Sequence, residues 1–185
     1  VYMDTPPYEV LQTNYIPYRE MRFLKIFEDV FDHTYNTGKF EHTLSYLLAN
    51  AYDGDAFALF KALTDWWEQK GLYPAAHSVR NMAFLLIEFC EDVTPALAEE
   101  MEEVLRFDIF LAQPNWRPEI FTWHDDELKL ATLEFWRRNE VVKKYLPDYD
   151  FSTWRKIRKC FPIEKFLWHP QKGKGEGYVI LADYT

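Results

Sequence analysis

Histidine, cysteine and carboxylate side chains could hold a metal ion in this chain, so their spacing is the first test of its chemistry. A di-iron helical bundle needs a Glu three residues before a His on two helices, because both side chains must reach one pair of metal ions. None of the five histidines has a Glu at that position. The two cysteines, Cys90 and Cys160, cannot by themselves hold an iron–sulfur cluster or a structural zinc ion.

Asp29 and His33 stand one helical turn apart and could share a metal, since residues four apart lie on the same face of a helix. No third ligand has suitable spacing, and both residues fall on the polar arc of the predicted helix. We therefore predict a solvated pair. His124, Asp125 and Asp126 are better interpreted as a helix start, where acidic side chains meet the positive end of the helix dipole.

Nucleophile and phosphate-loop motifs are also missing. None of the serines lies in a Gly-x-Ser-x-Gly setting, which excludes the common serine-hydrolase arrangement. The stretch from Lys172 to Gly177 is rich in Gly and Lys, but it lacks the Ser or Thr of a phosphate loop and leads into a predicted strand. We interpret it as a hairpin tip. We predict no catalytic, cofactor-binding or metal-binding residue in this chain.

The composition is that of a globular protein, with 48% apolar and 28% charged residues among 185. Aromatic residues reach 18% and occur in every predicted helix, so most of the seven tryptophans are expected in the core. No apolar run approaches the roughly 20 residues of a membrane span, and no signal peptide is recognisable. We expect a cytoplasmic protein.

The net charge of −9 is unevenly distributed. Residues 1–105 carry 7 basic and 18 acidic side chains, whereas residues 106–185 carry 14 basic and 12 acidic ones. Either the basic C-terminal third binds nucleic acid or a phosphorylated ligand, or the acidic and basic regions face each other or a partner domain. We favour the second interpretation, because the bases occur in separated pairs.

The elements that must position these residues are mostly helices. Residues 1–16 are predicted to be extended, because Pro6-Pro7 disfavours helix. A helix follows from Pro17 towards Gly38, and its apolar arc is predicted to hold Met21, Leu24, Phe27, Val30 and Phe31. Further helices are predicted over residues 40–51, 55–71 and 94–111, and one more begins at Ser78 and includes Phe89. The capping signals are Asp53-Gly54-Asp55, Ser78 and Thr94-Pro95.

In the C-terminal part of the chain, the pattern of apolar residues changes from that of helices to that of strands. Residues 113–124 are predicted to be a loop, residues 125–147 one long helix, and about 152–159 a short helix capped by Ser152. Residues 163–168 and 178–184 have the composition of two strands of a β-hairpin. We therefore predict a mostly α fold, an irregular bundle of about six to seven helices with a C-terminal β-hairpin at about 161–184. Residues 17–185 would form one domain, after a linker over residues 1–16 from a missing upstream domain.

Three stretches carry a resemblance to a known family: Pro6-Pro7-Tyr8-Glu9-Val10-Leu11, Tyr35-Asn36-Thr37-Gly38-Lys39-Phe40 and Val179-Ile180-Leu181-Ala182-Asp183-Tyr184. The chain resembles the helical domain of uncharacterised function at the C-terminus of cobalamin-binding radical-SAM iron–sulfur proteins. These proteins are relatives of the anaerobic magnesium-protoporphyrin monomethyl ester cyclase. In that family the first stretch leaves the barrel, the second ends a long helix, and the third belongs to a closing hairpin.

The resemblance implies a non-catalytic accessory domain of an oxidoreductase, which covers the barrel or shapes substrate access. Its partners would be the radical-SAM barrel and the cobalamin-binding domain upstream in the same polypeptide. The 4Fe-4S cluster, S-adenosylmethionine and cobalamin would then all lie upstream of Val1, since this chain has no Cys-x-x-x-Cys-x-x-Cys motif. The candidate interface residues are Tyr8, Glu9, Tyr35, Asn36 and His42.

A second hypothesis stays open, in which the chain is a free-standing helical binding module. Its basic C-terminal third would then bind an anionic ligand or nucleic acid, and the binding would weaken with salt. We do not expect a membrane or nucleic acid as the partner under the first hypothesis. Tight, salt-sensitive binding of nucleic acid would therefore count against it.

Overall fold

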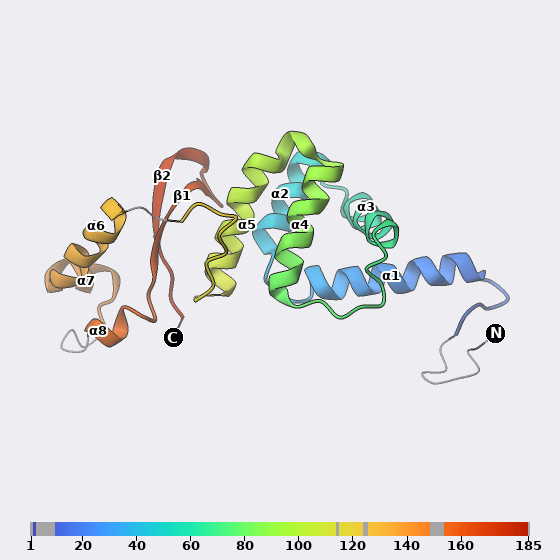
Figure 1. Cartoon of the computed structure of the whole chain (residues 1–185), viewed down its shortest axis with the longest axis horizontal. Coiled ribbons are helices and arrows are strands. Elements are labelled where there is room, and N and C mark those ends of the chain that lie inside the picture. Colours follow the sequence, from blue (N-terminus) through green and yellow to red (C-terminus); the bar gives the residue numbers. More distant parts are fainter. Residues whose placement is uncertain (1, 3–9, 114, 124–125, 149–153, 185) are drawn as a thin grey trace. The chain divides into compact units, whose positions relative to one another are not determined.

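The structure is a computed structural model that describes residues 2, 10–113, 115–123, 126–148 and 154–184. Within these ranges it contains eight α-helices, one short 3-10 helix and a two-stranded antiparallel sheet (Figure 1). The mostly α fold with a C-terminal hairpin is therefore confirmed. The chain forms two compact units, Val1–Met101 and Glu102–Thr185. The single domain over residues 17–185 and the linker over residues 1–16 stay predictions.

In the described residues of the first unit the secondary structure is helical, apart from an isolated β-bridge between Tyr2 and Val10. The helices are α1 (Tyr18–Thr34), α2 (Glu41–Ala51), α3 (Ala56–Gln69), α4 (Val79–Val93), η1 (Pro95–Leu97) and the start of α5 (Ala98–Ala112). Helix α3 packs against α1 and α2, and α1 also packs against α4. Of the helices in the described ranges, none has the length and apolar character that crossing a membrane requires.

Local capping decides where two of these helices begin. The side chain of Asp55 accepts a hydrogen bond from a backbone N–H of α3 at 3.0 Å, and Ser78 does the same for α4 at 3.2 Å. Gly38 ends the turn after α1 with a φ of 64°, which only glycine adopts without strain. Thr94 differs from the prediction, because its side chain caps no helix and a 3-10 turn precedes α5.

The buried arc of α1 also differs from the predicted one. Ile26 and Val30 are fully buried, whereas Leu24 is 49% exposed. Phe27 and Phe31 lie beside this arc and are half-buried. The spacing of apolar residues in α1 is compatible with either buried arc. Packing against α3 and α4 buries the arc that contains Ile26.

The second unit is organised around the hairpin. It contains most of α5, then α6 (Asp126–Arg137), α7 (Asn139–Tyr145), α8 (Trp154–Ile157), β1 (Ile163–His169) and β2 (Gly173–Leu181). In Figure 1 the hairpin lies between α5 and the group α6–α8. Alternate strand residues point to opposite faces. Accordingly, Phe166 packs against Phe107 and Phe110 of α5, while Ile163 and Leu181 pack against the cluster around Trp136.

The predicted long helix over residues 125–147 is wrong, because it is divided into α6 and α7. Arg138 separates them with φ −99° and ψ 86°. No Pro or Gly lies at this point, so local chemistry does not cause the break. The change of direction lets Val142 and Leu146 of the second segment join Trp136 in one buried cluster. Ser152, the predicted cap of the next helix, lies outside the described residues.

The glycine-rich stretch belongs mostly to β2 rather than to the hairpin tip. The turn is formed by residues 170–172, and β2 begins at Gly173. Phe166 pairs with Tyr178 and Trp168 pairs with Lys174, so three residues of β2 lie opposite Leu167. This bulge contains Gly175 and Gly177, which have no side chain to crowd the bend.

Candidate interaction surfaces

Helices α1 and α3 share a row of aromatic rings, the aromatic stripe, formed by Phe23, Phe27, Phe31, Tyr35, Phe57 and Phe60. The first four stand four residues apart, so they follow one face of the helix and its C-cap. The ring of Phe31 lies 4.8 Å from that of Tyr35 and 4.8 Å from that of Phe60. The stripe is only partly covered, since Tyr35 is 59% exposed and Phe57 is 63% exposed.

At its Tyr35 end the stripe opens into a pocket of about 450 Å³, which we call the Tyr35 pocket. Leucines of α2 and α3 form its apolar lining, among them Leu44 and Leu59. Asn36 and Glu41 are polar side chains of the lining. A mostly apolar hollow with few polar groups is typical of a binding site.

The charge around the Tyr35 pocket is acidic. Residues 26–60 contain six acidic side chains and one basic one, Lys39. Glu41 lines the pocket, and Asp55 directly precedes the lining residue Ala56. The surface therefore favours an apolar partner that carries basic groups.

The structure brings together two of the five candidate interface residues. Tyr35 and Asn36 both line the Tyr35 pocket, and the Asn36 amide also donates a hydrogen bond to Asp32 at 2.5 Å. His42 is half-buried on α2 and does not line the pocket. Tyr8 and Glu9 lie outside the described residues.

Asp29 and His33 are not the solvated pair that the sequence predicts. The Asp29 carboxylate accepts a hydrogen bond from the Trp67 indole at 3.2 Å and lies 3.4 Å from Nδ1 of His33. The His33 ring lies 5.5 Å from the ring of His77. These half-buried contacts join α1 to α3 and to the turn before α4. In the described part of the chain no group of three His, Cys, Asp or Glu side chains could hold a metal ion.

The remaining titratable candidates have local roles. Asp126 begins α6 and lies 2.8 Å from Nζ of Lys129, whose hydrogen bond lowers the pKa of this carboxyl. His124 and Asp125 lie outside the described residues. Burial raises the pKa of the Cys90 thiol to about 12, so this cysteine is protonated and unreactive at neutral pH. Cys160 is exposed.

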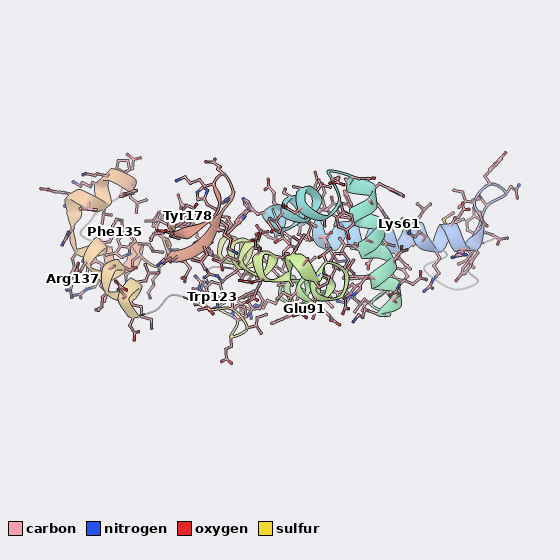
Figure 2. The ribbon with its side chains drawn as sticks, turned by 90° about the horizontal axis from the view of Figure 1, so that it is seen from above. Lys61, Glu91, Trp123, Phe135, Arg137 and Tyr178 are labelled. Atoms are coloured by element: carbon pink, nitrogen blue, oxygen red, sulfur yellow. The ribbon has the colours of Figure 1, made fainter. Side chains whose placement is uncertain are left out.

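A buried charged group lies in the second unit, and we call it the Arg106 cluster: Glu103, Arg106, Trp123, Glu164 and Phe166. The Arg106 side chain is 5% exposed, and its guanidinium lies 4.2 Å from the centroid of the Phe166 ring. Its Nη2 donates to Glu103 at 2.7 Å, and its Nη1 lies 3.7 Å from the buried carboxylate of Glu164. Trp123, labelled in Figure 2, covers it from the loop after α5 at 5.3 Å.

The same cluster covers an edge of β1. Arg106 donates to the backbone carbonyl of Lys165 at 2.7 Å, and Glu103 accepts from the backbone N–H of Leu167 at 2.5 Å. Two side chains of α5 thus replace a neighbouring strand. An uncovered edge can pair with another chain, and this contact occupies two backbone groups that such pairing would need.

Sequence reasoning missed the Arg106 cluster. Two signals were present: Glu103 and Arg106 have helical i,i+3 spacing, and Glu164 alternates with Phe166 on the inward face of a predicted strand. Neither signal shows that the helix and the strand meet.

Most basic residues of the C-terminal third, unlike the buried Arg106, lie on the surface of the second unit. Eight of them between positions 137 and 159 are exposed: Arg137, Arg138, Lys143, Lys144, Arg155, Lys156, Arg158 and Lys159. Two of the arginines, Arg155 and Arg158, pack over Trp154 with centroid distances of 5.6 and 5.7 Å. Three of the seven tryptophans, Trp66, Trp67 and Trp136, are buried and the other four are half-buried, so fewer of them lie in the core than the sequence predicts.

The chain was compared with protein families, curated proteins and solved structures. The model of a family described as Protein of unknown function (DUF4080) matches residues 1–180. No curated protein and no solved structure matches the chain.

Proposed function

The chain belongs to this DUF4080 family of unknown function, and from this premise we propose that it is the non-catalytic C-terminal accessory domain of a cobalamin-binding radical-SAM iron–sulfur oxidoreductase. In this proposal it covers the barrel or shapes the access of substrate. Its partners are the upstream barrel and cobalamin-binding domain of the same polypeptide, in the cytoplasm. The proposal extends the resemblance of the three sequence stretches to the activity of a whole protein.

The exposed aromatic stripe is the observation that supports a docking role. Burying one large apolar side chain contributes about 1.5–3 kcal/mol. Tyr35 and Phe57 each expose more than half of their surface, Tyr35 beside Phe31 and Phe57 beside Phe27. An exposed apolar surface of this kind marks a site of interaction with another protein or domain.

The second supporting observation is the position of the Tyr35-Asn36-Thr37-Gly38 turn, which is part of the resemblance. This turn joins α1 to α2, and three of its residues line the Tyr35 pocket. The residues that resemble the family therefore shape the surface that we propose for docking.

The residues of this chain do not fit the cluster of a radical-SAM enzyme. Such a cluster needs three thiolates, and the chain has two cysteines. One of them, Cys90, is buried with its pKa raised to about 12, which opposes the thiolate form. The cluster belongs in our proposal to the upstream part of the polypeptide.

The test begins with the native reading frame upstream of Val1, which should encode Cys-x-x-x-Cys-x-x-Cys. Hydroxyl-radical footprinting then compares the whole polypeptide with the chain of residues 1–185. We expect oxidation of Tyr35 and Phe57 to fall several-fold in the whole polypeptide, because docking removes both rings from water.

Phe84 of α4 is the matched control, since it is an aromatic residue of the same unit with 42% exposure outside the stripe. Its oxidation should be the same in both samples. A start codon immediately before Val1, or equal oxidation of Tyr35 and Phe57 in the two samples, would contradict the proposal.

The alternative is a free-standing module that binds an anionic ligand or nucleic acid. The observation in its favour is the exposure of eight bases between positions 137 and 159. Binding of single-stranded oligonucleotides that is tight at low salt and weakens steeply with added salt would support it. The same result would count against the accessory role.

A further inference from the structure

One face of α2 gives the Tyr35 pocket its charge. Four residues of this helix line the pocket at helical spacing, so they share one side of it: Glu41, Leu44, Ser45 and Leu48. Glu41 is the charged residue of the described lining, and it is exposed at the start of α2. In the described part of the chain no base forms an ion pair with Glu41. The pocket therefore has an apolar wall with a carboxylate that is open to a partner.

The other polar groups of the lining can accept hydrogen bonds. The Asn36 amide donates to Asp32, and its carbonyl oxygen remains an acceptor. The Ser45 hydroxyl is exposed and can also accept. With the carboxylate of Glu41, the lining offers three kinds of acceptor oxygen. It therefore suits a group that donates several hydrogen bonds and carries a positive charge.

Aromatic rings and a further acid favour the same kind of group. The exposed ring of Tyr35 lies 6.4 Å from the ring of Phe60, and both residues line the pocket. A cation near the face of an aromatic ring is stabilised by it. Asp55 directly precedes the lining residue Ala56, whereas Lys39, the base of the preceding turn, does not belong to the lining.

We propose that the docking partner anchors in the Tyr35 pocket through a lysine side chain that stands beside an apolar one. This inference rests on the docking role proposed above and names the chemistry of the partner. The apolar side chain would pack on Leu44, Leu48 and Leu59, and the lysine ammonium would lie at Glu41.

Lysine fits this site better than arginine does. Its alkyl stem can lie on apolar surface while its ammonium stays at the exposed rim. The three N–H donors of the ammonium can each meet a separate acceptor, whereas a guanidinium is a planar fork. The pocket volume of about 450 Å³ is within the range of ligand pockets, roughly 300–1,000 Å³, so it leaves room for the apolar neighbour.

The first test uses a probe and the chain of residues 1–185. The probe is 4-phenylbutylammonium, which joins an apolar group to an ammonium by a four-carbon stem like that of lysine. We expect saturable binding with a Kd on the order of 1 mM, and shifts of the methyl signals of Leu44, Leu48 and Leu59 in NMR spectra. 5-Phenylpentanoate has the same stem and the opposite charge, and it should bind about tenfold more weakly.

Three variants locate the binding of this probe. Glu41→Gln keeps the shape of the side chain and removes its charge, so it should weaken binding about threefold to fivefold. Glu91→Gln is the matched control, because Glu91 is an exposed acid of α4 that does not line the pocket (Figure 2). It should leave the affinity unchanged. Ser45→Trp places a large ring on the pocket face of α2 and should abolish binding.

The second test asks whether docking uses the same carboxylate. In the whole polypeptide, a carbodiimide should cross-link Glu41 to a lysine upstream of Val1, because this reagent joins a carboxylate to an amine in contact with it. Glu41→Lys should raise the oxidation of Tyr35 several-fold, towards its level in the chain of residues 1–185. Glu91→Lys should leave this oxidation unchanged.

The outcomes separate this inference from the docking role. If Tyr35 and Phe57 are protected in the whole polypeptide but Glu41→Lys does not reduce the protection, the lysine anchor is wrong and the docking role stands. Equal oxidation of both rings in the two samples contradicts the docking role and the anchor with it. Equal affinity for the two probes, equal weakening by Glu41→Gln and Glu91→Gln, or the absence of a cross-link from Glu41 to a lysine would overturn the anchor alone.

Discussion

The two units of the chain bury different kinds of polar groups. In the first unit, the buried polar side chains among the described residues are Thr34, Thr43 and Thr64. In the second unit they are Arg106, Asp108 and Glu164. In the first unit, the two side chains of the ion pair between Arg22 and Glu68 are each 45% exposed. In the second unit, the side chains of Arg106 and Glu164 are 5% and 1% exposed.

The difference follows from charge balance. Residues 1–101 carry 7 basic and 16 acidic side chains, so acids outnumber bases by nine and a buried acid of the first unit would often lack a counter-charge. Residues 102–185 carry 14 of each sign. A balanced unit can bury a charge beside its counter-charge, which is the only arrangement that keeps such burial tolerable.

From this comparison of the two units, we predict that replacing Glu164 causes the largest loss of stability. Glu164→Leu removes one of the two carboxylates beside the buried guanidinium of Arg106, which keeps Glu103, and it should destabilise the second unit by about 1.5–3 kcal/mol. Hydrogen exchange of peptides from each unit, followed in increasing urea, measures the two stabilities separately. Exchange in the first unit should stay unchanged.

Glu68→Leu in the first unit is the control for this experiment. It removes one partner of an exposed pair and should change stability by no more than about 1 kcal/mol. The double variant Arg106→Leu/Glu164→Leu should be more stable than Arg106→Leu alone, because Arg106→Leu removes the counter-charge of the Glu164 carboxylate, whose side chain is 1% exposed. Equal losses from Glu164→Leu and Glu68→Leu would show that the two units do not differ.

A smaller effect is expected from alkaline pH, through the buried thiol of the first unit. Burial raises the pKa of Cys90 from its usual 9 to about 12, so the folded unit keeps this proton at a pH where the unfolded chain loses it. The stabilisation is complete below pH 9 and is lost as the pH rises towards 12. Between pH 8 and 10, ionisation of this thiol in the unfolded chain should lower the free energy of unfolding by about 1.4 kcal/mol.

Cys90→Ala is the variant that isolates this effect. Urea denaturation at pH 8 and 10 should show a smaller loss of stability in the variant than in the unchanged chain. Cys160→Ala is the control, since Cys160 is exposed and its replacement should leave the pH dependence as it is. The same pH dependence in all three proteins would refute the role of Cys90.

The smallest effect is expected at Thr64, a buried polar residue of the first unit. Its hydroxyl donates only to the carbonyl of Phe60, one turn earlier in the same helix, at 2.7 Å. Thr64→Val keeps the shape and removes this local bond, so the free energy of unfolding should change by less than about 1 kcal/mol. A loss as large as that of Glu164→Leu would mean that buried polar groups matter equally in both units.

Much of the fold was predictable because its signals are local. Asp55 and Ser78 begin their helices as predicted, and Gly38 takes the positive φ that a helix end favours. The hairpin also follows from the composition of its strands. The Tyr35 turn was identified from the sequence as an interface candidate, but the pocket beside it could not be, because two helices, α2 and α3, form that pocket together with the turn.

The sequence by itself determined the kind of each element, its caps and the sign of the charge in each half, since these depend on neighbours a few residues apart. Only the tertiary structure decided that Ile26 rather than Leu24 is buried, that α6 and α7 separate at Arg138, and that Glu164 meets Arg106 across 58 positions. Burial is set by the sum of all contacts around a side chain. Residues far apart in the sequence supply most of those contacts, and their arrangement is not encoded in any local period.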